Sequence, residues 1–197
     1  QRDQKNKEWK GISYTPPLAS TRRIGFLGAG QLGSACAQDA VYMGFPVSCW
    51  SRSEKDIHGV TSYFGTDQFD KFLSESDILV ILAPLTPETY NLLDKTRLSQ
   101  LPEGASIINA GRGSLIVDED LLELLDSGHI DRAILDVFRK EPLPEDHPYW
   151  THPDVLMTPH ISAITHPKTS AEHIYEVVTS IENGDTPPGM VDLQLGY

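Results

Sequence analysis

The sequence predicts an α/β fold built on a doubly wound parallel sheet, and three observations lead to that prediction. Short apolar runs alternate along the chain with segments of helical pattern. These runs lack a regular alternation of polar and apolar residues, which is typical of strands covered on both faces of a parallel sheet. An early run leads into a glycine-rich turn and then into a helix of small residues. With 197 residues the chain can bury one well-packed domain or two small ones.

Seven apolar runs are the expected strands, with helices between and after them. The strands are expected at residues 24–27, 47–50, 60–64, 78–82, 106–109, 133–137 and 155–157, and the helices at 31–44, within 89–101, at 118–127 and at 168–183. The third helix has the strongest pattern, because Asp118 can serve as its N-cap, leucines recur along it and Gly128 ends it. After the last helix, Asn183 and Gly184 predict a stop, and the prolines that follow require an irregular tail.

Composition and charge exclude several classes of function. The net charge of −12 argues against a nucleic acid partner, which would need clustered Lys and Arg to neutralise phosphates. No apolar stretch approaches a membrane span, and the N-terminus has no apolar signal core, so we expect a soluble cytoplasmic protein without membrane association. Cys36 and Cys49 fit small buried residues in a reducing compartment. No metal site is expected, because there is no His-x-x-x-His or cysteine pair and the acidic residues are dispersed.

The glycine-rich turn has the pattern G-x-G-x-x-G directly after the first predicted strand. Gly28 allows the tight turn, Gly30 lets the backbone approach a pyrophosphate, and Gly33 lets the helix pack against the strand. The helix that begins at Gln31 and Leu32 would direct unpaired N–H groups and its positive dipole end at the phosphates. The motif predicts a Rossmann-type dinucleotide site, and a glycine-rich turn without a ligand is the alternative.

The end of the second predicted strand indicates which dinucleotide is preferred. In folds that prefer NAD, an acidic residue about 20 positions past the glycines accepts the ribose hydroxyls. Here the chain has Ser51, Arg52 and Ser53. A guanidinium flanked by hydroxyls offers charge-assisted donors to a 2′-phosphate, which a carboxylate would repel. We therefore expect NADP(H), with NAD(H) as the alternative if Arg52 only occupies a solvated loop.

Three separated residues carry the predicted chemistry: Arg112, Glu141 and His160, each just after an apolar run. Together they can bind a carboxylate and move a proton beside it. The planar fork of Arg112 can pair bidentately with a carboxylate, with a structural salt bridge as the alternative. An imidazole titrates near neutrality, so His160 can act as acid or base, while Glu141 fixes its tautomer. The other six histidines are expected to be structural.

These motifs resemble the cofactor-binding domain of the D-isomer-specific 2-hydroxyacid dehydrogenases, and most closely its glyoxylate/hydroxypyruvate reductase branch. The similarity runs from about residue 22 to the C-terminus. Besides the glycine loop, the segments that carry it are Cys49-Trp50-Ser51-Arg52-Ser53, Ala83-Pro84-Leu85-Thr86-Pro87-Glu88-Thr89, Ile108-Asn109-Ala110-Gly111-Arg112-Gly113, Leu135-Asp136-Val137-Phe138 and Thr158-Pro159-His160. The resemblance implies hydride transfer between NADP(H) and a small 2-oxo or 2-hydroxy acid, with glyoxylate or hydroxypyruvate as the expected substrate.

The same resemblance implies roles for further residues. Pro84 and Thr86 are expected to line the cofactor cleft, although a plain turn would explain them nearly as well. Asp136, with backbone groups around Ala110, is expected to orient the nicotinamide carboxamide, and an Asp that caps its own turn is the alternative. Trp150 resembles an aromatic residue near the substrate pocket, with core packing as the alternative.

In this family a substrate domain precedes the cofactor domain, and nothing in the sequence corresponds to it. We therefore expect residues 1–20 to be a connection from a missing substrate domain, and residues 21–197 to be the NAD(P)-binding domain with a C-terminal helix and tail. Such a piece is expected to bind cofactor but to turn over poorly. The resemblance also implies a homodimer, with an interface around residues 115–125. Two other functions stay open: an NAD-linked dehydrogenase for another acid, such as lactate, phosphoglycerate or formate, and a nucleotide-sensing relative that does not catalyse.

Overall fold

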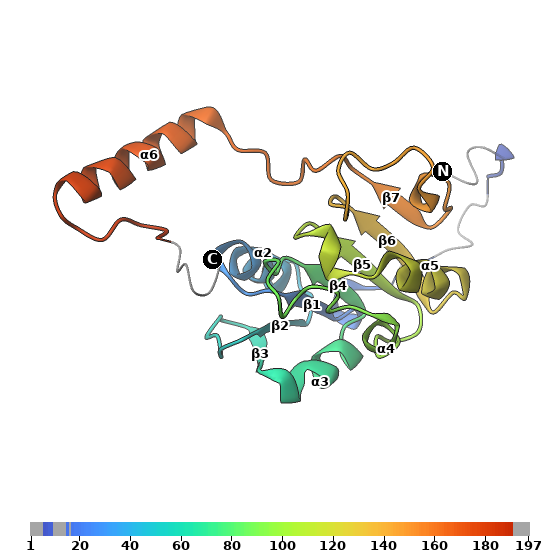
Figure 1. The fold of residues 1–197 in the computed structure, drawn as a ribbon. Coiled ribbons are helices and arrows are strands. Elements are labelled where there is room, and N and C mark those ends of the chain that lie inside the picture. Colours follow the sequence, from blue (N-terminus) through green and yellow to red (C-terminus); the bar gives the residue numbers. More distant parts are fainter. Residues whose placement is uncertain (1–5, 10–14, 16, 191–197) are drawn as a thin grey trace.

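The computed structural model describes residues 6–9, 15 and 17–190, so most of the predicted connection across residues 1–20 lies outside the described residues. A seven-stranded sheet with the order β3-β2-β1-β4-β5-β6-β7 forms the centre (Figure 1). Its strands are β1 (Ile24–Leu27), β2 (Val47–Ser51), β3 (Val60–Phe64), β4 (Ile78–Ile81), β5 (Ala105–Asn109), β6 (Ile130–Leu135) and β7 (Val155–Met157). Every neighbouring pair is parallel. This order, which reverses direction at β1, confirms the predicted Rossmann-type doubly wound sheet.

Four of the described helices lie between successive strands, and another follows β7. They are α2 (Gln31–Tyr42), α3 (Phe69–Ser74), α4 (Lys95–Leu98), α5 (Asp118–Asp126) and α6 (Pro167–Glu182), with 3-10 turns η1 (Ala19–Thr21), η2 (Thr66–Gln68), η3 (Gly113–Leu115) and η4 (Pro148–Trp150). Helix α3 was not predicted, because its six residues are too few for a periodic pattern. The helix expected within residues 89–101 is reduced to the single turn of α4, whose N-cap Asp94 accepts a hydrogen bond from the Arg97 backbone N–H.

Two predicted boundaries were wrong for reasons visible in the contacts. Strand β6 begins at Ile130 rather than residue 133, because buried Ile130 pairs with Ala105 although two charged residues follow it. The N-cap of α5 is Val117, and Asp118 is the first helical residue. The carboxylate of Asp118 does not cap the helix but accepts a hydrogen bond from the Tyr149 hydroxyl at 3.1 Å.

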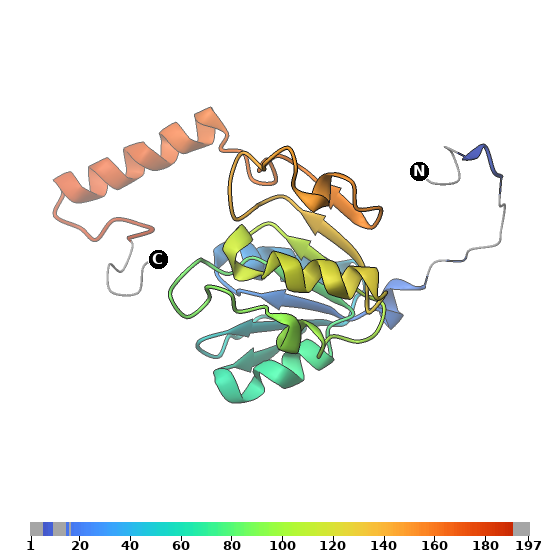
Figure 2. The same ribbon diagram turned by 45° about the vertical axis from the view of Figure 1, so that its right-hand side comes forward.

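Each face of the sheet buries its own apolar core. One core lies beneath α2 and contains Ile24, Phe26, Ala29, Ala37, Ala40, Val47 and Cys49. The larger core lies beneath α3, α4 and α5 on the opposite face, and Figure 2 shows α5 across the sheet from α2. Leu115, Leu121, Leu124 and Leu125 all belong to it and are at most 6% exposed. These four leucines are therefore core residues, and the dimer interface expected around residues 115–125 stays a prediction.

Helix α6 stands away from the sheet in both ribbon views (Figures 1 and 2). None of its residues is buried, and Ile174, Tyr175, Val178 and Ile181 are exposed. Neither α6 nor any other helix in the described part of the chain combines the length and apolar character that a bilayer span requires.

Candidate active site

The predicted functional loops all follow the carboxyl ends of strands. Because the strands are parallel, these ends meet at one edge of the sheet, where open α/β folds bind their ligands. The loops after β1, β2 and β4 form one half of this edge, and the loops after β5, β6 and β7 form the other (Figure 1).

The three motif glycines meet different surroundings. Gly28 has φ of 104°, and a Cβ there would lie 2.6 Å from the backbone nitrogen of Ala83. A Cβ on Gly33 would lie 1.9 Å from the carbonyl oxygen of Gly28, so the helix packs against the turn as predicted. A Cβ on Gly30 would meet nothing within 4 Å. The protein's own packing therefore requires glycine at residues 28 and 33, whereas residue 30 borders open space.

The start of α2 fits a phosphate group. Gly30 is the N-cap and supplies no side-chain hydrogen bond to the first turn, while the side chains of Gln31 and Leu32 are exposed. Backbone N–H groups at an uncapped helix N-terminus, beside a glycine with open space over it, are the donors that a pyrophosphate needs.

The end of β2 is tied directly to the glycine loop, because the backbone N–H of Gly28 donates to the Trp50 carbonyl at 2.9 Å. Beyond it, the Ser51 hydroxyl donates to the Ser53 carbonyl at 2.6 Å, and Arg52 and Ser53 are exposed. The hydrogen bond with Thr86 is the largest cause that lowers the pKa of Glu88, and the charge of Arg52 contributes. Arg52 therefore lies close to the turn that follows β4.

That turn holds itself together through Thr89. Its hydroxyl donates to the Pro84 carbonyl at 2.7 Å and accepts from the Thr86 backbone N–H at 2.7 Å. Pro84 is exposed and Thr86 is half-buried at the edge of the sheet. No helix follows directly, because Leu93 bridges to Ile116 instead.

The loop after β5 carries Arg112. Buried Asn109 shapes this loop, since its side chain accepts from the Gly111 backbone N–H and donates to the Arg112 carbonyl, both at 3.1 Å. The Arg112 side chain is exposed, and its Nη1 donates to the Gly111 carbonyl at 2.7 Å. The backbone N–H of Ala110 donates to the Ile81 carbonyl at 3.2 Å.

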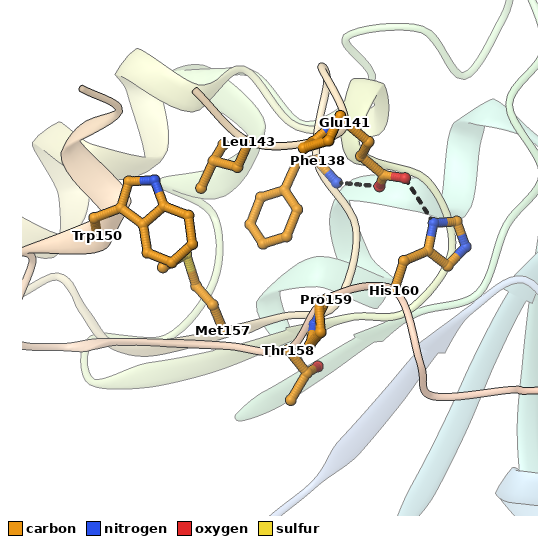
Figure 3. Close-up of a pocket in the computed structure, with 9 residues that line it drawn as sticks. Phe138, Glu141, Leu143, Trp150, Met157, Thr158, Pro159 and His160 are labelled. Atoms are coloured by element: carbon orange, nitrogen blue, oxygen red, sulfur yellow. Dashed lines mark hydrogen bonds and ion pairs between the residues drawn. The ribbon is translucent and has the colours of Figure 1, made fainter. Parts of the chain in front are cut away.

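The structure brings Glu141 and His160 together as predicted. His160 Nδ1 lies 2.8 Å from Glu141 Oε2, and the Phe138 backbone N–H donates to the other oxygen, Oε1, at 2.9 Å (Figure 3). The hydrogen bond with His160 is the largest cause that lowers the pKa of Glu141. The second ring nitrogen, Nε2, points away from the carboxylate in Figure 3. The pair is therefore arranged to exchange a proton at Nε2.

Asp136 holds the turn that carries His160. Its carboxylate is buried and accepts hydrogen bonds from the Thr158 hydroxyl and from the backbone N–H groups of Ile161 and Ser162, the latter two at 2.9 and 3.0 Å. Burial raises the pKa of Asp136, but these hydrogen bonds outweigh it and lower the pKa to about 2. His160 itself has φ of 56°, a conformation that few non-glycine residues adopt, and its N–H donates to the Asp136 carbonyl at 2.8 Å. Asp136 thus caps a turn, and its expected contact with the nicotinamide stays a prediction.

A cavity of about 580 Å³ adjoins the Glu141–His160 pair. Its lining residues are mostly apolar: Phe138, Glu141, Pro142, Leu143, Trp150, Met157, Thr158, Pro159 and His160. Trp150 is 55% exposed and its indole N–H donates to the Pro144 carbonyl at 2.8 Å, so it lines this cavity and does not pack in the core (Figure 3). Arg112 is not part of the lining.

The remaining histidines lie elsewhere. Of the chain's seven histidines, all within the described residues, only His160 lines this cavity. His152 Nε2 lies 3.3 Å from Asp126, and His147 Nε2 lies 3.6 Å from Asp118. Within residues 6–9, 15 and 17–190, no group of three or more His, Cys, Asp or Glu side chains is arranged to hold a metal ion.

Sequence reasoning missed the residues that position the reacting groups. Asn109 and Thr158 lie inside the motifs that carry Arg112 and His160. Their position in these motifs was the only sequence feature that could have indicated a supporting role.

Comparison with known proteins identifies the family. The model for "D-isomer specific 2-hydroxyacid dehydrogenase, NAD binding domain" matches residues 1–162. The chain is 44% identical over 194 residues to glyoxylate/hydroxypyruvate reductase A of Serratia proteamaculans, covering 98% of this chain and 61% of that protein. It is 48% identical over 174 residues to the protein of the same name from Photorhabdus laumondii, covering 88% of this chain and 56% of that one. The chain thus spans less than two thirds of the length of these curated relatives.

Solved structures of proteins named for the same family also resemble this chain. A D-isomer specific 2-hydroxyacid dehydrogenase from Xanthobacter autotrophicus Py2, in complex with NADPH and MES, superposes with a TM-score of 0.95 at 41% identity, covering 100% of this chain and 80% of that one. An NADPH-dependent glyoxylate/hydroxypyruvate reductase from Sinorhizobium meliloti, in complex with NADP and sulfate, gives a TM-score of 0.94 at 36% identity, covering 100% of this chain and 63% of that one. From its sheet order, its glycine loop and these matches, the chain belongs to the D-isomer specific 2-hydroxyacid dehydrogenases, and it carries their NAD-binding domain.

Proposed function

We propose that the protein is an NADP(H)-dependent reductase of a small 2-oxo acid, with glyoxylate or hydroxypyruvate as substrate. The observation that carries this proposal is the Glu141–His160 pair, joined at 2.8 Å at the sheet edge where the glycine loop also ends. The names of the relatives from Serratia proteamaculans and Photorhabdus laumondii support the choice of substrate.

His160 is the proposed acid in the reductive direction. An ionised carboxylate can only accept hydrogen bonds, so Glu141 requires Nδ1 of the imidazole to be the donor. The proton that leaves is then the one on Nε2, which goes to the carbonyl oxygen as the carbonyl carbon takes up hydride. Glu141 stabilises the imidazolium before transfer and keeps the ring orientation afterwards. In the oxidative direction the same nitrogen accepts the proton.

Arg112 is the proposed anchor for the substrate carboxylate. Its guanidinium is exposed, and among the described residues its side chain donates one hydrogen bond, from Nη1 to the Gly111 carbonyl, so that its other N–H groups can pair bidentately with an anion. The positive charge also draws electron density from the neighbouring carbonyl, which favours hydride addition at carbon.

The cofactor, when bound, supplies the hydride. Gly28, Gly30 and Gly33, with the first turn of α2 at Gln31 and Leu32, would hold its pyrophosphate. Ser51, Arg52 and Ser53 would receive the adenosine 2′-phosphate, in keeping with relatives solved with NADPH or NADP. For the nicotinamide half we propose contacts from Pro84, Thr86, Ala110 and Asp136, which all lie after strands at the same edge.

The test of function compares cofactors and substrates in the complete protein. We expect glyoxylate or hydroxypyruvate to be reduced with NADPH faster than with NADH, measured as loss of reduced-nicotinamide absorbance. Calorimetry at fixed salt should show that Arg52→Ala weakens NADPH binding by about 10-fold or more while NADH binding changes little, since only NADPH carries the phosphate. Arg132→Ala removes an exposed arginine on β6 and is the matched control.

The outcomes separate the alternatives. Equal or tighter NADH binding would contradict the phosphate argument and favour an NAD-linked dehydrogenase for another acid. Cofactor binding without turnover of any 2-oxo acid would favour a nucleotide-sensing relative.

For assembly and location we propose a homodimer in the cytoplasm. The family resemblance supports the dimer, and two free thiols at Cys36 and Cys49 are in keeping with a reducing compartment. Light scattering coupled to size-exclusion chromatography would measure the mass of the complete protein, and a monomer at micromolar concentration would contradict the dimer.

A further inference from the structure

Arg139 is the most heavily engaged side chain near the reacting pair that the proposed mechanism leaves without a role. It lies two residues before Glu141 on the loop after β6, and its side chain is 25% exposed. Its Nη2 donates to two acceptors, the side-chain oxygen of Asn91 and the backbone carbonyl of Ile116. The guanidinium carbon also lies 5.7 Å from the ring centre of Tyr90.

Both acceptors belong to segments that are joined to each other. The Asn91 backbone N–H donates to the Ser114 carbonyl at 2.9 Å, and the Leu93 N–H donates to the Leu115 carbonyl at 2.9 Å. One of these segments continues the Pro84–Thr89 turn, and the other continues the loop that carries Arg112. Arg139 therefore fastens the Glu141 loop to both.

The backbones of the loop after β5 and the loop after β6 are also in direct contact. A Cβ on Gly113 would lie 2.0 Å from the Phe138 carbonyl carbon and 2.4 Å from the Arg139 nitrogen. The loop after β5 thus lies directly against the loop after β6, with Arg112 next to Gly113 in the first loop and Glu141 three residues after Phe138 in the second. A small shift between the two loops would change the placement of Arg112 relative to the reacting pair.

The charge of Arg139 is balanced within the protein. Its Nε lies 3.7 Å from Asp118 Oδ2, while the Tyr149 hydroxyl donates to Oδ1 of the same carboxylate at 3.1 Å. His147 Nε2 lies 3.6 Å from Oδ2 as well. Desolvating such a group is costly, and well-packed apolar residues often give equal stability. The ion pair between Arg139 and Asp118 is therefore better explained as a contact that fixes the position of the loop than as one that raises the stability of the fold.

From these contacts we propose that Arg139 is a positioning residue, which holds the Glu141–His160 pair in register with Arg112 by fastening the Glu141 loop to the segments at Asn91 and Ile116. The inference rests on the proposed function. Arg139 touches neither Glu141 nor His160 in any hydrogen bond or ion pair that the structure gives, so its effect on them is exerted through the loop.

The test uses Arg139→Met in the complete protein, with Arg132→Met as a control that removes an exposed arginine from β6. We expect kcat for glyoxylate reduction with NADPH to fall about 10- to 100-fold, because misplacement of reacting groups costs rate far more than affinity. The Kd for NADPH should change less than about threefold, since the phosphate cradle is formed by other loops. Arg139→Lys should recover only part of kcat, because Lys lacks the planar fork that reaches two acceptors.

A second set of variants separates positioning from folding. Asn91→Gly keeps the positive φ of 56° at that residue accessible and removes one acceptor, so it should lower kcat in the same direction and combine non-additively with Arg139→Met. Tyr149→Phe removes a partner of Asp118 but none of the Arg139 contacts to the loops, so it should lower the melting temperature and leave kcat unchanged. If Arg139→Met fails to fold, Arg139→Lys and Asn91→Gly carry the test.

A readout that needs no substrate keeps this inference distinct from the proposed function. The pKa of Glu141, lowered chiefly by its hydrogen bond with His160, should rise toward its ordinary value in Arg139→Met, followed by carbon NMR of the labelled carboxyl group. An unchanged pKa together with unchanged kcat in the folded variants would overturn the positioning role. A wild-type protein that reduces no 2-oxo acid would overturn the proposed function instead, and the Glu141 titration would still decide on Arg139.

Discussion

The two halves of the candidate site are built in different ways. The half after β1, β2 and β4 is shaped by backbone contacts and a short turn: Gly33 packs against the Gly28 carbonyl, the Gly28 N–H donates to the Trp50 carbonyl, and Thr89 closes its own turn. The half after β5, β6 and β7 is shaped by side chains that reach across long sequence separations, such as Asp136 to Ser162 and Arg139 to Asn91. A surface for a phosphate chain needs free N–H groups at a fixed spacing, which a short turn can supply, whereas a proton-transfer pair needs two side chains from different loops held to within fractions of an ångström.

The largest effect is expected from the reacting pair. His160→Gln removes the group that donates and accepts the proton but can still reach Glu141, so kcat should fall about a thousandfold while the Kd for NADPH changes less than about threefold. His152→Gln is the control, because His152 lies against Asp126 away from the cavity. Steady-state kinetics with calorimetry measures both quantities. A loss of NADPH affinity as large as the loss of kcat would show that the two halves are not separable.

Gly33→Ala and Gly30→Ala should differ in what they damage. A Cβ on Gly33 would collide with the Gly28 carbonyl at 1.9 Å, so the free energy of unfolding should fall by about 3 kcal/mol. A Cβ on Gly30 meets nothing within 4 Å, so stability should change by less than about 1 kcal/mol while NADPH affinity falls. Urea unfolding without and with NADPH distinguishes the two variants. Equal destabilisation by both would contradict the assignment of Gly30 to the ligand.

Asp136 should link the stability of the catalytic half to pH. Its pKa of about 2 in the folded protein lies below the ordinary value of 3.8, so its carboxylate stabilises the fold above about pH 4, and this contribution is lost as pH falls toward 2. Asp136→Asn should therefore cost roughly 2 kcal/mol at neutral pH and little at pH 2. Asp39→Asn, at an exposed site on α2, is the control. Urea unfolding across this pH range checks the prediction, and a pH-independent difference between variant and wild type would contradict it.

Much of the fold could be predicted because its cause is local. Short runs of apolar residues predicted all seven strands, and β1, β3 and β7 have the predicted bounds. The errors came from tertiary contacts that no local pattern contains. Ile130 joins β6 because it pairs with Ala105. The Asp118 carboxylate accepts a hydrogen bond from the Tyr149 hydroxyl and does not cap the helix.

At the candidate site, the reacting residues could be predicted from the sequence, but the contacts that hold them in place could not. Glu141 and His160 could be predicted because an imidazole that titrates near neutrality and a carboxylate that fixes its tautomer form a proton-transfer pair, and the structure joins them. The family resemblance implies a nicotinamide contact for Asp136, which stays a prediction, and the structure adds that its carboxylate accepts three hydrogen bonds from the turn that carries His160. The partners of a side chain depend on which loops lie against each other in the fold. The spacing of residues along the sequence does not predict that the loops at residues 91, 116 and 139 meet.

The smallest effect is expected from Thr89, the cofactor-side counterpart of Asp136. Thr89→Val keeps the shape but removes a hydroxyl that donates to Pro84 and accepts from Thr86, both at 2.7 Å, so unfolding should become easier by about 1 kcal/mol. Because this turn spans only six residues, its loosening should weaken NADPH binding about two- to fivefold and leave kcat at saturating NADPH unchanged. Thr66→Val, which alters an exposed threonine beside Asp67, is the control. A fall in kcat at saturating NADPH would instead mean that the Thr89 turn also positions the reacting pair, through the segment at Asn91 that accepts a hydrogen bond from Arg139.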